Sequence, residues 1–129
     1  MKRRLDVRFL IVLVLAVGVL GGAGAIARFL LDGSVSSLTD HLLPWGTLAV
    51  NLSGALALGV LTGAAVDGDA LRLAGTGLLG AYTTFSTWVY ESHRLGEDGE
   101  LRWGVVNLLL SLALGIGAVW LGRELGAAL

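Results

Sequence analysis

Charged residues are absent from four long stretches of the chain, and short polar segments separate these stretches. They cover residues 9–27, 42–66, 73–90 and 103–122. An α-helix needs about 20 residues to cross a hydrocarbon core about 30 Å thick, and each stretch approaches or exceeds that length. Apolar and polar positions do not alternate within them, as they would in the strands of a membrane barrel. The pattern therefore predicts four transmembrane helices.

The composition agrees with a membrane-embedded chain. Of the 129 residues, 55% are hydrophobic and 15% are charged, whereas soluble domains carry about 25% charged residues. A soluble domain this small could not cover its apolar surface with polar side chains. The connecting segments 32–41, 67–72 and 91–102 are too short to fold alone. Residues 1–129 are therefore expected to form one all-α transmembrane domain, multi-pass in a cell membrane, with spans at about 9–31, 44–66, 71–93 and 102–123.

The basic N-terminal tail bears on processing and on orientation. Lys2, Arg3 and Arg4 precede an apolar stretch that ends in Ala-Ile-Ala at 25–27. A cleaved secretory signal is therefore an alternative, although its removal would leave three spans. With four spans, both termini lie on one side together with six of the nine basic residues. This bias favours cytoplasmic termini, but without the tail the count is two against three.

Glycine is abundant and recurs at a spacing that lets helices approach closely in lipid. Among the 20 glycines, small-xxx-small pairs occur at Gly18/Gly22, Gly21/Ala25, Ala55/Gly59, Gly59/Gly63 and Gly122/Gly126. Most of these pairs can pack the helices of a single chain against each other. Their number nevertheless suggests more close-packed surface than one four-helix unit needs, so we expect an oligomer.

Two predicted spans carry a polar stripe. Thr47 and Asn51 lie four residues apart in the second span, and Asn107 and Ser111 lie four apart in the fourth. Residues at this spacing share one face of a helix. Each pair alone can serve as hydrogen-bonding glue between helices. Two such stripes in one small chain suggest a shared polar lining.

The third span contains the most unusual segment, residues 80–88. Four hydroxyl residues (Thr83, Thr84, Ser86 and Thr87) fall within five positions, beside the aromatic residues Phe85 and Trp88. Hydroxyl and β-branched residues are mediocre helix formers, and their hydroxyls can satisfy backbone groups that a local break sets free. A continuous helix whose hydroxyls bond back to its own backbone is the alternative, and the local residues leave both open.

Ionisable residues are confined to the ends of the predicted spans. Arg28 ends the first span, and Glu91, His93 and Arg94 end the third. A proton-coupled transporter usually needs an ionisable relay inside the membrane. No triad or metal spacing surrounds His41 or His93, and cysteine is absent, so we expect no enzyme. The net charge of −1 gives no basic field for nucleic acid.

The lining that remains consists of neutral amide and hydroxyl donors together with aromatic edges, which are the positive rims of the rings. Such a lining suits a small anion that moves passively. A cation pathway would more often show carboxylates or a filter of backbone carbonyls.

Three segments in order complete the sequence evidence. They are GGAGAIAR at 21–28, PWGTLAVN at 44–51 and GLLGAYTTFSTW at 77–88. These segments resemble the motifs G-G-x-G-A-x-x-R, P-x-G-T-x-x-x-N and G-x-x-G-x-x-T-T-F-S-T-F of the Fluc/CrcB fluoride channels. The resemblance covers about residues 18–122, and three motifs with matched spacing are highly specific.

The resemblance implies a passive channel that exports cytoplasmic fluoride. It implies an antiparallel, dual-topology homodimer with two pores along the subunit interface and a third helix that is broken at the membrane centre. A structural, non-transported Na⁺ would be held there by backbone carbonyls, here those of Gly80 and Thr83. Some members of the family pair two oppositely oriented paralogues, so a heterodimer is the alternative.

The resemblance also assigns site residues. It places Asn51, Phe85 and Trp88 in the pore, and Trp88 departs from the phenylalanine that the family has there. Further hydroxyl or amide contacts are expected from Thr47, Ser86, Thr87, Asn107 and Ser111. Arg28 matches an arginine near the pore entrance, where it would raise the local anion concentration. Alternatively, Arg28 is an interfacial anchor that snorkels to lipid head groups.

Two other classes of protein match the length and the number of spans. A small proton-coupled multidrug exporter would need a glutamate embedded in the membrane, and the middle of each span lacks one. A non-transporting membrane scaffold would use the polar stripes only for packing.

Overall fold

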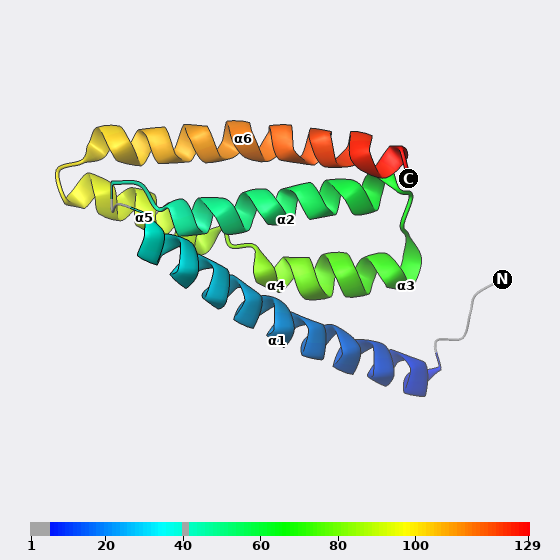
Figure 1. Cartoon of the computed structure of the whole chain (residues 1–129). Coiled ribbons are helices and arrows are strands. Elements are labelled where there is room, and N and C mark those ends of the chain that lie inside the picture. The colour runs from blue at the N-terminus through cyan, green and yellow to red at the C-terminus, as the bar shows by residue number, and fades with distance from the viewer. Residues whose placement is uncertain (1–5, 40–41) are drawn as a thin grey trace.

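Seven helical segments make up the part of the chain that the computed structural model describes, residues 6–39 and 42–129. No strand lies within these residues. The segments are α1 (Val7–Leu38), α2 (Trp45–Gly63), α3 (Gly68–Leu71), η1 (Arg72–Leu79), α4 (Gly80–Tyr82), α5 (Ser86–Glu97) and α6 (Leu101–Ala127) (Figure 1).

Three of these helices are long and apolar enough to cross a membrane, namely α1, α2 and α6. They fall on the first, second and fourth predicted spans. The third predicted span falls on a chain of shorter segments, because α3, η1 and α4 are separated from α5 by three non-helical residues. The η1 segment is a π-helix, a rare form that is often found at functional sites.

The connecting segments are shorter than predicted. We expected residues 32–41 to join the first two spans, but α1 continues as a helix to Leu38. Serine hydroxyls bond back to the helix there: Ser34 Oγ donates to the carbonyl of Leu30 at 2.7 Å and Ser37 Oγ to that of Ser34 at 2.8 Å. Polar residues can therefore continue the helix. Lys2, Arg3, Arg4 and His41 lie outside the described residues.

Helices α2 and α6 lie side by side and run in the same direction (Figure 1). Glycines form the seam between them. A Cβ atom at Gly59 would collide with the carbonyl of Val119, and one at Gly122 with the carbonyl of Leu56. Gly63 and Gly126 are equally tight against the opposite backbone. Two of the predicted small-xxx-small pairs therefore pack helices within one chain.

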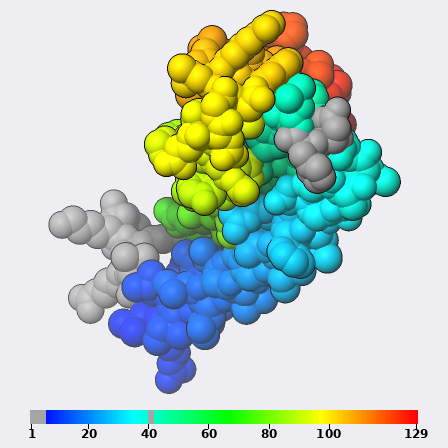
Figure 2. Space-filling model, turned by 90° about the vertical axis from the view of Figure 1, so that its left-hand side faces the viewer, coloured from blue at the N-terminus to red at the C-terminus, as the bar shows by residue number. Residues whose placement is uncertain are grey.

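Helix α1 packs against η1, α2 and α4, and the rest of its surface is largely exposed. A Cβ atom at Gly24 would collide with the carbonyl of Leu78, so the helices meet backbone to backbone. Figure 2 shows α1, blue to cyan, as an outer surface of the molecule. Gly18 and Gly22 face open space, and most apolar side chains of this helix are exposed, as expected for a surface in contact with lipid.

Candidate functional site

The helical backbone of the third apolar segment stops at Tyr82 and resumes at Ser86. Thr83 has an extended backbone (φ −79°, ψ 158°), and its N–H and Oγ1 both donate to the carbonyl of Leu79 at 3.0 Å. Phe85 already has helical dihedral angles (φ −86°, ψ −44°). The non-helical stretch is therefore short and centred on Thr84.

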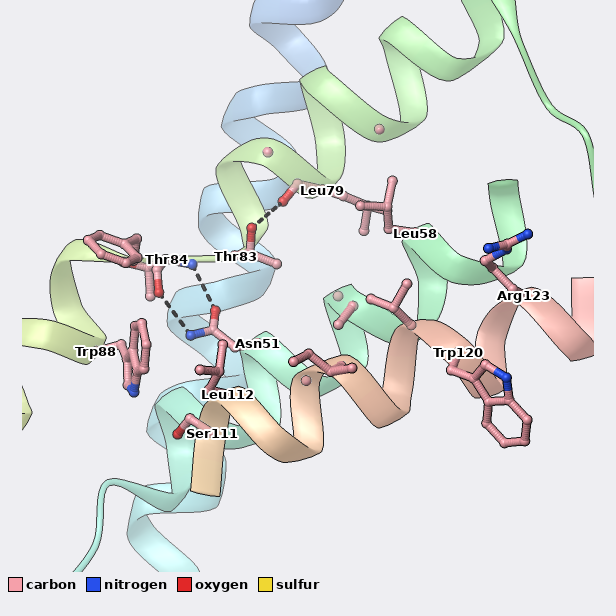
Figure 3. Close-up of a pocket in the computed structure, with 18 residues that line it drawn as sticks. Asn51, Leu58, Leu79, Thr83, Thr84, Trp88, Ser111, Leu112, Trp120 and Arg123 are labelled. Atoms are coloured by element: carbon pink, nitrogen blue, oxygen red, sulfur yellow. Dashed lines mark hydrogen bonds between the residues drawn. The ribbon is translucent and has the colours of Figure 1, made fainter. Parts of the chain in front are cut away.

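Asn51 of α2 holds this stretch from outside. Its Nδ2 donates to the carbonyl of Thr84 at 2.8 Å, and its Oδ1 accepts from the N–H of Thr84 at 2.8 Å (Figure 3). One carboxamide thus satisfies both backbone groups of an interrupted residue, which is the requirement that buried backbone imposes.

The hydroxyl of Thr84 caps the helix that follows. Thr84 Oγ1 accepts from the N–H of Thr87 at 3.2 Å and donates to Thr87 Oγ1 at 3.0 Å. Threonine is a favoured N-cap because its oxygen satisfies an N–H of the first turn that has no partner within the helix. The hydroxyl residues of this segment therefore act partly on their own backbone.

These bonds change the partners of two carbonyls. In a continuous helix the carbonyl of Gly80 would accept from the N–H of Thr84, and that of Thr83 from the N–H of Thr87. Here Thr84 N–H bonds to Asn51 and Thr87 N–H bonds to the Thr84 hydroxyl. The carbonyl oxygens of Gly80 and Thr83 therefore lose their helical donors at the interruption.

A groove of about 690 Å³ lies beside the interruption, between α2, the η1–α4 segment, the start of α5, and α6 (Figure 3). Most of its wall is apolar. Among the predicted site residues, it is lined by Asn51, Gly80, Thr83, Phe85, Trp88 and Ser111. Arg123 lines it as well, and no carboxylate does among the described residues.

The two predicted pore aromatics meet edge to face at the groove. The ring centroids of Phe85 and Trp88 lie 5.4 Å apart with the planes at 73°. Phe85 is 73% exposed. The indole N–H of Trp88 donates to the backbone carbonyl of Asn107 at 3.4 Å. The extra donor that distinguishes Trp88 from phenylalanine is therefore bound to α6.

The polar stripe of α6 divides between two environments. Asn107 is 3% exposed, and its Nδ2 donates to Ser92 Oγ of α5 at 2.7 Å. Ser111 Oγ donates to Asn107 Oδ1 at 3.4 Å and lines the groove. Asn107 thus joins α5 to α6, and only Ser111 of this pair lies on the groove.

Thr47, on the face of α2 that also carries Asn51, has a different partner. It is 3% exposed, and its Oγ1 donates to Glu91 Oε1 at 3.0 Å. Glu91 lines a second cavity of about 440 Å³ with Asp32 and Arg94. The other carboxylate oxygen of Glu91 is buried and has no hydrogen bond within the described part of the chain.

Three further predicted residues lie away from the groove wall. Ser86 and Thr87 form the first turn of α5. Arg28 is partly exposed on α1 and makes no hydrogen bond or ion pair with the residues that the structure describes. The structure therefore brings six of the predicted site residues together and leaves Thr47, Asn107, Ser86, Thr87 and Arg28 outside the groove.

The predicted site residues did not include Thr84, Glu91 or Ser92, although Thr84 belongs to the hydroxyl residues that were expected to satisfy released backbone groups. The cap by Thr84 has a sequence signal, since a threonine three residues before Thr87 fits the N-cap spacing. The pairs Thr47–Glu91 and Asn107–Ser92 join residues 44 and 15 positions apart, and no local pattern marks them. No cluster of three acidic or histidine side chains that could hold a metal ion occurs among the described residues.

Comparison with known proteins gives consistent matches. The family model described as "CrcB-like protein, Camphor Resistance (CrcB)" matches residues 15–123. The chain is 48% identical over 109 residues to a protein of Mycolicibacterium paratuberculosis named fluoride-specific ion channel FluC 2, covering 84% of this chain and 89% of the relative. It is 45% identical over 114 residues to fluoride-specific ion channel FluC of Geobacter sulfurreducens, covering 84% and 92%.

Proposed function

The chain belongs to the CrcB-like protein family, and from this premise we propose that it is a passive fluoride-selective channel that lets fluoride leave the cytoplasm. The observation that carries the proposal is the bidentate bond of Asn51 to Thr84 beside the exposed ring of Phe85 and the half-buried ring of Trp88. A channel performs no covalent chemistry, so the chain is not an enzyme.

Fluoride must exchange its water for other donors in the membrane. The Nδ2 of Asn51 carries two hydrogens, of which Thr84 takes one, so the second can donate to an anion in the groove. The positive edges of Phe85 and Trp88 add electrostatic solvation. Ser111 lines the same groove from α6, where its hydroxyl donates to Asn107 Oδ1.

Passive conduction is favoured over proton coupling. An exporter coupled to protons needs a titratable acid that substrate can reach. Within the described residues the groove has no carboxylate, and Glu91 is bound to Thr47 outside it. The relatives that are named fluoride-specific ion channels favour transport over a scaffold without transport.

The groove also supports assembly with a second copy. Phe85, Ile116 and Trp120 are each more than 60% exposed, and Gly115 on the groove wall has no atom within 4 Å of its Cβ position. An antiparallel homodimer would cover these side chains and enclose the ion path. In this proposal the η1–α4 and α5 segments together form a fourth, broken span. A heterodimer with an oppositely oriented paralogue is the alternative, since the basic residues favour one side.

The interruption fits a structural Na⁺. The carbonyl oxygens of Gly80 and Thr83, which lack their helical donors, belong to residues on the groove wall. Carbonyl oxygens are suitable ligands for a hard cation. When bound between two copies, the ion would supply positive charge at the centre of the assembly.

The test is fluoride efflux from vesicles. The purified polypeptide is reconstituted with trapped potassium fluoride, valinomycin balances the charge, and a fluoride electrode records release. We expect release without a proton gradient and none of chloride. Phe85→Ile and Asn51→Asp should each abolish efflux while the dimer persists on size exclusion. Retention of fluoride by the unmodified protein would contradict the proposal, and release only with a pH gradient would favour the exporter.

A further inference from the structure

Thr84 is the residue at which the polar bonds of the interruption converge, and the proposed function uses only its backbone and not its hydroxyl. Its N–H and carbonyl both bond to Asn51 at 2.8 Å. Its hydroxyl accepts from the N–H of Thr87 and donates to the Thr87 hydroxyl. The main chain and side chain of this one residue are therefore fixed from two helices.

The neighbouring Phe85 depends on this fixation. Its ring is 73% exposed and has an edge-to-face contact with Trp88. The surrounding chain packs little against it, so its direction follows from the backbone that carries it. Phe85 lies between Thr84 and the first turn of α5, and its carbonyl accepts from the N–H of Val89 at 3.0 Å.

Removal of the cap offers the backbone another arrangement. Without the Thr84 hydroxyl, the N–H of Thr87 can bond instead to the carbonyl of Thr83, which is its ordinary helical acceptor. Helix α5 would then begin earlier. Phe85 already has helical dihedral angles, so its direction relative to α5 would not change. The backbone of Thr84 would turn instead, which weakens its pair of bonds to Asn51 and lets the start of α5, with the Phe85 ring, move away from the groove wall.

We propose that Thr84 is a positioning residue for ion conduction: its cap on Thr87, with the backbone pair to Asn51, keeps the Phe85 ring at the groove. This inference rests on the proposed function, because it assumes that Phe85 contacts the ion. Thr84 itself is assigned no contact with fluoride.

The experiment combines efflux with a direct report on Phe85. The chain contains three phenylalanines, Phe9, Phe29 and Phe85, so 4-fluorophenylalanine gives few ¹⁹F resonances, and Phe85→Leu assigns the third. The variants are Thr84→Val, which keeps the shape and removes the hydroxyl, and Thr84→Ser, which restores it. Thr76→Val is the matched control, because Thr76 lies exposed on η1 without a side-chain hydrogen bond in the described structure.

We expect Thr84→Val to shift or split the Phe85 resonance and leave those of Phe9 and Phe29 in place. Fluoride efflux at low concentration should fall by about fivefold, as the loss of an N-cap predicts, with a smaller loss at saturating fluoride. Thr84→Ser and Thr76→Val should match the unmodified protein in both measurements.

Three results would overturn the proposal. They are an unchanged Phe85 resonance with normal efflux, reduced efflux with an unchanged resonance, and failure of Thr84→Ser to restore either. If Thr84→Val does not fold, Thr84→Ala replaces it, since alanine is a poor N-cap; an undisplaced Phe85 in that variant would contradict the role of the cap. If the unmodified protein releases no fluoride, the proposed function fails, and the resonance still tests the position of Phe85.

Discussion

The glycine seam between α2 and α6 and the interruption at Thr84 satisfy the backbone hydrogen bonds of their helices in opposite ways. In the seam, glycines bring two continuous helices into backbone contact, and each helix satisfies its own hydrogen bonds. At the interruption the helix does not satisfy all of its own hydrogen bonds, and Asn51 supplies the missing partners from another helix. The uninterrupted helix pair therefore provides stability, whereas the interruption provides polar groups that can bind an ion.

The largest loss of stability is expected from a substitution in the glycine seam. Gly122→Leu places a side chain against the carbonyl of Leu56, where even a Cβ atom collides. Overpacking against backbone should cost more than about 3 kcal/mol, so the chain should lose its folded form. Thermal unfolding in detergent, followed by size exclusion, measures this. Gly117→Leu on the same helix is the control, because the Cβ position of Gly117 meets no atom within 4 Å; equal loss in both variants would contradict the seam.

A smaller loss of stability, together with a complete loss of fluoride efflux, is expected at the interruption. Asn51→Leu keeps the size of the side chain and leaves two backbone groups of Thr84 without their partner. The cost should be about 2 kcal/mol, with efflux abolished and the helical content retained. Circular dichroism and fluoride efflux measure the two parts. Ser53→Ala removes an exposed hydroxyl contact to Tyr82 at 2.7 Å and should change neither stability nor efflux. A comparable loss of efflux in that control would contradict a specific role of Asn51.

The smallest effect is expected from Trp88→Phe. The substitution removes the bond from the indole N–H to the carbonyl of Asn107 and keeps an aromatic edge at the groove. We expect about 0.5–1 kcal/mol of destabilisation and efflux that persists with chloride still excluded. Chloride leakage, measured with a chloride electrode on the same vesicles, would mean that the indole does more than bind α6.

The sequence predicted the features that depend on one helix alone. Uncharged length predicted α1, α2 and α6, and the family resemblance is confirmed by the matching family model. It was less informative where a residue depends on a distant partner. Local residues left a break or a continuous helix open at 80–88, because the side chain that holds Thr84 comes from 33 positions earlier in the chain.

The two polar stripes show the same limit. Thr47 and Asn51 share a face, as do Asn107 and Ser111, yet in each pair only one residue lines the groove. Four residues advance a helix by about 6 Å along its axis, which is enough to change which neighbouring helix a side chain meets. Spacing can therefore predict a shared face but cannot predict the partner that each side chain finds.

The unexpected length of α1 has a practical consequence. Its 32 residues extend about 48 Å at 1.5 Å per residue, well beyond the hydrocarbon thickness, and we expect its polar last turns, with Asp32, Ser34 and Ser37, to project into the aqueous phase. Gly33 in this projecting part has free space around it, and the chain contains no cysteine. A thiol introduced by Gly33→Cys would be a unique reactive handle, and a membrane-impermeant maleimide would reveal which side of the bilayer each copy faces.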